Sequence, residues 1–281
     1  MKKIAVVTDS TAYMPDALIK KHNIHIIPAK IHWDDSTLID GVDITPAQFY
    51  ERLDRSATIP STSQPSAGDF LKLFNDLSTK YDEIIALLVS SGISGTINSA
   101  EVALNTFTNK PVVIIDTHSA SGGLGMIVVE AAKAVSEGKS LKEIKQIAED
   151  IVKKLKVFFV VDTLKYLHKG GRIGGASRYL GSALDIKPIL YLDDSGKIEA
   201  LEKVRTKKKA TSRLVELAAE YANGRLVNVS VLHANVLEEI TYLRDQLLEQ
   251  LDCNQIDIYE LSPAIGVHVG PGTIGIAIYP I

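Results

Sequence analysis

The feature that most constrains the fold of this chain is an uninterrupted apolar run, IIALLV at residues 84–89. Such a run is typical of a strand that is buried on both faces of a parallel sheet. Shorter β-branched runs at 4–7 and 112–115 also end in polar loops, and helices are predicted over 66–80 and 94–107. This alternation of strands and helices predicts an α/β fold for the first half, with a parallel sheet flanked by helices.

The second half has a different pattern, in which hairpins are mixed with helices. The tetrapeptide DDSG at 193–196 separates two apolar runs and is typical of an antiparallel hairpin turn. This mixture predicts an α+β fold with a mixed or antiparallel sheet. We therefore expect two domains, residues 1–156 and 157–281, that pack against each other. The predicted elements of the second domain include strands at 157–161, 189–192 and 198–204 and helices at 209–222 and 236–250.

Composition and charge exclude several classes of protein. Hydrophobic residues make up 46% of the chain and charged residues 23%, as in ordinary soluble globular proteins. The formal net charge of -3 argues against a dedicated nucleic-acid-binding protein. Cys253 is the only cysteine, so an intrachain disulfide is impossible and a cytoplasmic location is expected. No apolar run reaches membrane-spanning length, which argues against stable membrane insertion.

Histidine spacing gives no indication of a metal site. None of the seven histidines forms an H-x-x-x-H or H-E-x-x-H pair. A site built from four cysteines is excluded by the single cysteine. We therefore predict neither a metal nor another cofactor.

Three loops rich in Ser, Thr and Gly follow predicted strands, at 8–11, 90–96 and 116–123. In a parallel sheet such loops gather at the carboxyl edge, where ligands usually bind. Hydroxyl groups donate hydrogen bonds, and glycines let backbone N–H groups approach a ligand closely. A helix that begins near Ser94 would add free N–H groups that favour an anion. For any single loop, capping of a helix is the favoured interpretation, but several such loops at one edge favour an anion pocket.

Two further segments offer polar side chains to such a pocket. In IPSTSQPS at 59–66, Pro60 and Pro65 favour an extended backbone from which the polar side chains point outward. His268 lies in GVHVGPGTIG, where neighbouring glycines would let it approach an anion. The alternative for His268 is a turn residue without a binding role.

A serine hydrolase is an alternative interpretation of the same residues. The nucleophile motif of α/β hydrolases is G-x-S-x-G, but GISGT at 92–96 has its second glycine one position early. The order Ser94, Asp116, His268 is the order of the catalytic triad in that fold. Because a triad is defined by geometry, ester hydrolysis at Ser94 is the less favoured hypothesis.

Basic residues of the second half suggest a third hypothesis. In KVRTKKKA at 203–210, Lys207, Lys208 and Lys209 could contact RNA or an acidic protein. A run of charge is more often a solvated face, and no aromatic residues are interleaved with these lysines. GGRIGG at 170–175 lacks the G-x-G-x-x-G spacing of a dinucleotide site.

Together, five motifs resemble the signature stretches of the DegV family. They are DSTA at 9–12, STSQPS at 61–66, SSGISGT at 90–96, KGGRIGG at 169–175 and HVGPGTIG at 268–275. They occur in the family's order, and the chain length fits. The resemblance implies two α/β domains with a long-chain fatty acid between them and its acyl tail in an apolar tunnel. It also implies a carrier that is not itself an enzyme and that presents the fatty acid to a fatty acid kinase for acyl-phosphate formation.

The resemblance also implies roles for individual residues. Those that resemble carboxylate-binding residues are Thr62, Ser94 and His268, with Ser63 and Gly95 as helpers. Arg172 and Arg205 resemble basic residues at the pocket mouth that contact the kinase or an acyl phosphate. Ser61 stands where the family often has threonine, which keeps the hydroxyl group.

Overall fold

The computed structural model describes residues 2–181 and 186–281, and the strands in these residues form three sheets. The first is an all-parallel sheet in the order β2-β1-β6-β7. Its strands are β1 (Ile4–Asp9), β2 (Ile24–Ile27), β6 (Glu83–Leu88) and β7 (Val112–Asp116). Every residue of β1 and β6 is buried, which confirms the strand expected from the apolar run at 84–89.

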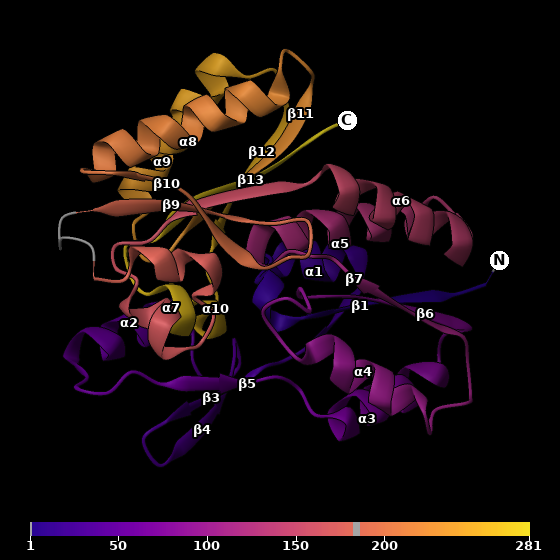
Figure 1. Ribbon diagram of the computed structural model, residues 1–281. Helices are drawn as coiled ribbons and strands as arrows, with labels where there is room; N and C mark the ends of the chain where they lie inside the picture. The colour runs from indigo at the N-terminus through magenta and orange to yellow at the C-terminus, as the bar shows by residue number, and fades with distance from the viewer. Residues whose placement is uncertain (1, 182–185) are drawn as a thin grey trace.

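Helices cover both faces of this parallel sheet, as the alternating pattern predicts. They are α1 (Asp16–His22), α3 (Ala67–Ser78), α4 (Thr96–Leu104), α5 (Ser121–Ser136) and α6 (Leu141–Lys154). In Figure 1, α3 and α4 lie on the outer face, whereas α5 and α6 lie between the parallel sheet and the second sheet. The amino half of α5 is buried because it contacts strands of both sheets.

The second sheet is mixed, in the order β10-β9-β8-β13-β11-β12. Its strands are β8 (Lys156–Val160), β9 (Lys187–Leu192), β10 (Ile198–Val204), β11 (Val227–His233), β12 (Cys253–Glu260) and β13 (Ile274–Pro280). Neighbours are antiparallel except β11 and β12, and β9 and β10 form the hairpin predicted around DDSG. Helices α8 (Lys207–Ala222) and α9 (Leu237–Gln250) cover its outer face. The sheet begins close to residue 156, but the division into two domains there stays a prediction.

A third, antiparallel sheet has the order β4-β3-β5, with β3 (Lys30–Trp33), β4 (Ser36–Ile39) and β5 (Ser61–Ser63). The extended backbone predicted for STSQPS is therefore confirmed by β5. Helices α2 (Pro46–Arg55) and α10 (Pro263–Val269) pack together, and α10 also contacts β3 and β5. Figure 1 shows α7 (Lys165–Lys169) beside α10. The contacts of α10 with α2, β3 and β5 place this late helix against early segments of the chain.

Two short helices lie in glycine-rich segments of the sequence. His268 lies in the helix α10, which excludes the alternative of a turn residue, and Ser262 caps that helix by accepting a hydrogen bond from the Ile265 N–H. The glycine-rich basic stretch LKYLHKGGRIGG at 164–175, which its composition predicts to be a loop, contains α7 and the start of the 3₁₀ helix η2 (Gly174–Tyr179). Glycines in or beside such helices lower the local helix propensity, so the sequence pattern does not reveal them.

No helix in the described residues has both the length and the apolar character needed to cross a lipid bilayer.

Candidate ligand cavity between the two sheets

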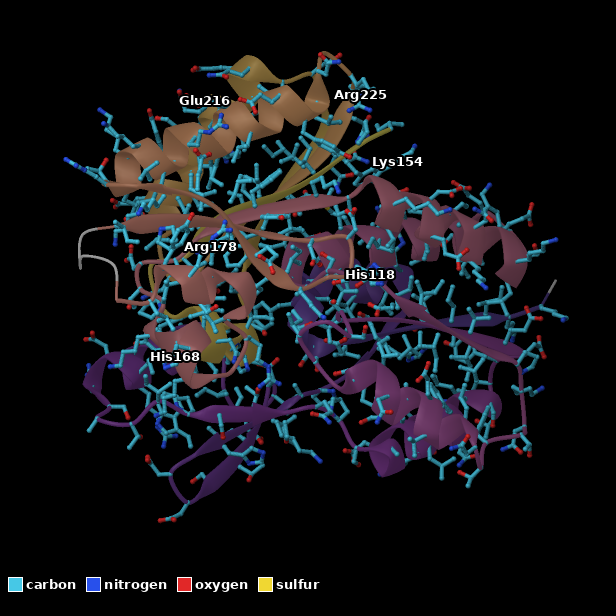
Figure 2. The ribbon with its side chains drawn as sticks, in the orientation of Figure 1. His118, Lys154, His168, Arg178, Glu216 and Arg225 are labelled. Carbon is cyan, nitrogen blue, oxygen red and sulfur yellow. The ribbon has the colours of Figure 1, made fainter. Side chains whose placement is uncertain are left out.

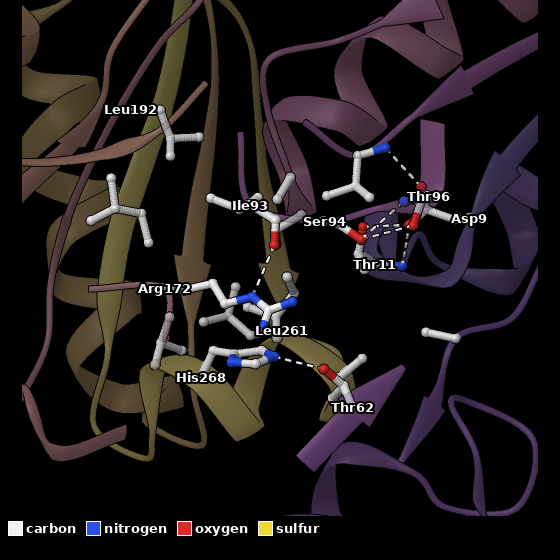
Figure 3. Close-up of a pocket in the computed structure, with 18 of the residues that line it drawn as sticks. Asp9, Thr11, Thr62, Ile93, Ser94, Thr96, Arg172, Leu192, Leu261 and His268 are labelled. Atoms are coloured by element: carbon white, nitrogen blue, oxygen red, sulfur yellow. Dashed lines mark hydrogen bonds between the residues drawn. The ribbon is translucent and has the colours of Figure 1, made fainter. Parts of the chain in front are cut away.

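A cavity lies at the carboxyl edge of the parallel sheet, where this edge meets the mixed sheet and α10 (Figure 3). Its volume is about 120 Å³, roughly ten times the space that one buried water molecule needs. Each of the five motifs supplies at least one lining residue. These residues include Asp9, Thr62, Ser94, Arg172 and His268. The prediction that polar loops gather at this edge is therefore confirmed.

Asp9 joins the first two of these loops. It is 1% exposed, and its carboxylate accepts hydrogen bonds from the Val89 N–H at 2.7 Å and the Thr11 N–H at 3.0 Å. Burial raises the pKa of the Asp9 carboxyl group, while these hydrogen bonds act in the opposite direction. Asp9 thus holds the end of β1 against the end of β6. The sequence indicates a polar loop here but not this role for its acid.

Ser94 lies two residues before the start of α4. Its Oγ accepts a hydrogen bond from the Thr96 N–H at 3.3 Å and lies 2.9 Å from Thr96 Oγ1. Gly95 is the N-cap residue and makes no side-chain cap. A β-carbon on Gly95 would lie 2.8 Å from Gln64 Nε2, so the glycine lets the loop after β5 approach α4 closely. This approach brings the STSQPS and SSGISGT motifs together.

Thr62 and His268 form a hydrogen-bonded pair in the wall of the cavity. Thr62 Oγ1 lies 2.7 Å from His268 Nε2, whereas the buried Nδ1 of His268 has no partner within the described residues. Burial, together with the nearby Arg172 charge, lowers the pKa of His268 to about 4. The imidazole is therefore neutral at pH 7 and carries one ring hydrogen. Gly170 packs so closely on Nδ1 that a β-carbon there would overlap it.

Asp40 positions the helix that carries His268. Its buried carboxylate accepts hydrogen bonds from the Ala264 N–H of α10 at 3.0 Å and from Ser10 Oγ at 2.6 Å. Burial raises the pKa of Asp40 to about 6. The contact spans 224 positions in the chain, and it attaches the amino end of α10 to the small antiparallel sheet.

Arg172 brings a positive charge to the cavity. Its Nε donates to the Ile93 carbonyl at 3.0 Å and its Nη1 to the Gly170 carbonyl at 2.7 Å. It makes no ion pair with an acidic side chain in the described part of the chain. The guanidinium is therefore held in place by carbonyl groups, and its charge is available to an anion in the cavity.

The remaining wall of the cavity is largely apolar. It comes mainly from the mixed sheet, with side chains that include Val157, Phe159, Leu192, Ile198 and Leu232. Leu192 and Ile198 are paired across the β9–β10 hairpin, so this hairpin covers part of the cavity. These residues could not be named from the sequence, because the face that each strand turns inward depends on strand pairing.

The turn of that hairpin also holds the two halves together. Ser90 Oγ donates to the Gly196 carbonyl at 2.8 Å. Gly196 has φ +71°, and a β-carbon there would overlap Ser90 Oγ and lie 2.8 Å from His118 Cα. Figure 2 shows His118 at this junction. The DDSG turn therefore rests directly on the SSGISGT loop.

Comparison with known proteins identifies the family. The family model described as "Uncharacterised protein, DegV family" matches residues 3–281. The chain belongs to the DegV family. Protein DegV of Bacillus subtilis is 36% identical over 278 residues, which cover 97% of this chain and 98% of that protein.

Solved DegV structures share the fold. One is a DegV family protein from Thermus thermophilus whose structure is described as showing fatty acid binding. It superimposes with a TM-score of 0.94 at 33% sequence identity, and the match covers 99% of this chain and 100% of the Thermus chain. DegV from Bacillus subtilis, described as a fatty acid binding protein, has a TM-score of 0.91 and 34% identity and covers 100% of each chain.

Ser63 and Arg205 are two further residues singled out by the DegV resemblance. Ser63 lines the cavity, but its hydroxyl lies 2.8 Å from His32 Nε2. Arg205 is exposed just after β10 and is not among the described residues that line the cavity. The roles of both residues in binding stay predictions.

The arrangement expected of a serine hydrolase is not formed by hydrogen bonds in the described residues. Ser94 is bonded to Thr96, and His268 is bonded to Thr62. Asp116 accepts hydrogen bonds from the His118 and Ser91 N–H groups and does not line the cavity. Nor does any group of three or more His, Cys, Asp or Glu side chains in these residues have the geometry of a metal site.

Proposed function

We propose that this DegV family protein binds a long-chain fatty acid, with the carboxylate at Thr62, Ser94 and His268 and the acyl chain along the apolar wall. One observation carries the proposal. Thr62 and Ser94 each have a neighbour that can donate to their oxygen, which leaves each hydroxyl hydrogen for a ligand. The description of two solved relatives as fatty acid binding supports the same conclusion.

One tautomer of the neutral histidine makes Thr62 a donor to the ligand. In the tautomer with its hydrogen on Nε2, His268 donates to Thr62 Oγ1, and the Thr62 hydroxyl then donates to a carboxylate oxygen. Thr96 does the same for Ser94, because its N–H and hydroxyl both lie within reach of Ser94 Oγ. Hydrogen bonds to an ionised carboxylate are stronger than those between neutral groups. Arg172 adds a positive charge on the same side.

The apolar wall accounts for the affinity for a long chain. An acyl chain of about sixteen carbons gains up to roughly 10 kcal/mol from burial, at ~0.8 kcal/mol per methylene group. The net affinity is lower because binding costs entropy. The hydroxyl groups need only orient the head group and satisfy its oxygens.

The protein acts as a carrier in this proposal and not as a catalyst. Its ligand is presented to a fatty acid kinase in the cytoplasm, where the carboxylate becomes an acyl phosphate. Arg172 at the cavity and the exposed Arg205 are the basic residues proposed to contact the kinase or the acyl phosphate.

Mass spectrometry of lipids extracted from the purified, denatured protein tests the proposal. We expect one fatty acid per chain, or uptake of one equivalent of added palmitate when none is copurified. The absence of both would contradict the proposal. Turnover of a chromogenic ester, with labelling of Ser94 by a fluorophosphonate, would instead support the hydrolase.

A further inference from the structure

The amino end of α5 contributes a polar group that the proposed carboxylate site does not use. Ser121, the first residue of α5, is 4% exposed and lines the cavity. Its Oγ is buried and has no hydrogen-bond partner in the described residues. A buried hydroxyl without a partner destabilises a folded protein, so most such groups are paired. This one belongs to a residue in the wall of the cavity.

The amino end of α5, beside Ser121, also offers polar groups to a ligand. The N-cap residue is Ala120, which makes no side-chain hydrogen bond to the first turn. α5 has 16 residues, and the first N–H groups of such a helix favour a partner with negative or partly negative charge. Ala120 also lines the cavity, so the uncapped start of α5 and the Ser121 hydroxyl occur together.

Close packing leaves no room for side chains at the next two positions of the helix. A β-carbon on Gly122 would lie 2.6 Å from both Leu232 Cδ2 and Ser230 Oγ, and one on Gly123 would overlap Ser119 Oγ. The first turn is thus pressed against β11 and β13 of the mixed sheet. Ser121 therefore lies on a different wall from Thr62 and His268, which come from β5 and α10.

We propose that Ser121 and the amino end of α5 form a second polar subsite that accepts a hydroxyl group on the acyl chain. This inference rests on the proposed function and adds hydroxy fatty acids to its ligands. A hydroxyl suits the subsite better than a second carboxylate, because Arg172 is the one Lys or Arg side chain among the described lining residues. A hydroxyl can both donate to and accept from Ser121 Oγ.

Titration calorimetry with the full chain tests the subsite. The probes are palmitate and a series of hydroxypalmitic acids in which the hydroxyl is moved along the chain. The variants are Ser121→Ala and Ser121→Gly. The glycine variant is included because glycine tolerates the φ of +51° at this position. Ser230→Ala is the matched control, because Ser230 Oγ is also buried without a partner in the part of the chain that the structure describes, but Ser230 is not among the lining residues.

We expect one hydroxyl position to bind at least as tightly as palmitate. Both Ser121 variants should weaken that acid by roughly tenfold, the loss of about one hydrogen bond, and leave palmitate within about twofold. The Ser230 control should change neither. If palmitate binds but every hydroxypalmitic acid binds much more weakly, the subsite is contradicted and the proposed function stands. An equal effect of the Ser121 variants on all acids would also contradict the subsite. Failure of palmitate itself to bind would overturn the proposed function.

Discussion

The substitution Thr62→Val tests the contribution of the Thr62 hydroxyl to the proposed carboxylate site, because it removes the hydroxyl and keeps the shape of the side chain. Valine keeps the β-branched form on β5 but removes the 2.7 Å hydrogen bond to His268 Nε2 and the donor to the ligand. Among the described residues His268 then has no partner at either ring nitrogen, since Nδ1 is already buried without one. Both the affinity for the ligand and the stability of the free protein should fall.

The two losses can be estimated separately. A hydrogen bond to a charged group contributes about 1.5–3 kcal/mol, so the palmitate affinity should fall by roughly 10- to 150-fold. The unpaired Nε2 should lower the free energy of unfolding of the free protein by about 1 kcal/mol. Titration calorimetry with palmitate measures the first loss, and urea denaturation measures the second.

A second Thr–His hydrogen bond in the same small sheet provides the control. Thr37 Oγ1 lies 3.1 Å from His32 Nδ1, and Thr37 is exposed and does not line the cavity. Thr37→Val should leave the palmitate affinity within about twofold of the wild type. Palmitate affinity in Thr62→Val within twofold of the wild type would refute the assignment of Thr62. An equal loss in both variants would point to damage of the sheet instead.

Three further predictions concern Ser94, Asp40 and Gly196. Ser94→Ala should weaken palmitate binding by roughly tenfold without unfolding the protein, whereas an unchanged affinity would remove Ser94 from the site. Burial raises the pKa of Asp40 from 3.8 to about 6, so between these pH values the folded protein retains a proton that the unfolded chain has lost. The free energy of unfolding should therefore fall as pH rises through this window, by up to about 3 kcal/mol, and denaturation of Asp40→Asn at several pH values should show a shallower slope. Gly196→Ala should lower the free energy of unfolding by about 2–4 kcal/mol, because its β-carbon would overlap Ser90 Oγ and its φ of +71° favours glycine; wild-type stability in thermal denaturation would contradict this packing.

The parallel sheet and its ligand edge could be predicted because their signals are local. An apolar run such as residues 84–89 identifies a buried strand without knowledge of its neighbours. Parallel strands then place the loops at Asp9, Ser94 and Ser121 on one edge. The prolines around STSQPS likewise favour the extended backbone that becomes β5.

The parts that could not be predicted depend on contacts between distant segments. The start of α10 carries a local signal, because Ser262 is its N-cap and Pro263 its first residue, but the Asp40 contact that supports this seven-residue helix spans 224 positions and could not be predicted. The pairing of Leu192 with Ile198 in the cavity wall follows from strand register. The Ser121 hydroxyl has no hydrogen-bond partner in the described residues, and its surroundings are set by the packing of α5 against the mixed sheet.

A crystal structure of the protein with bound palmitate tests the central claim most directly. We expect one carboxylate oxygen within about 3 Å of Thr62 Oγ1 and Ser94 Oγ, with the acyl chain against Phe159, Leu192 and Ile198. A palmitate carboxylate bound elsewhere, or an acyl chain outside this cavity, would contradict the account.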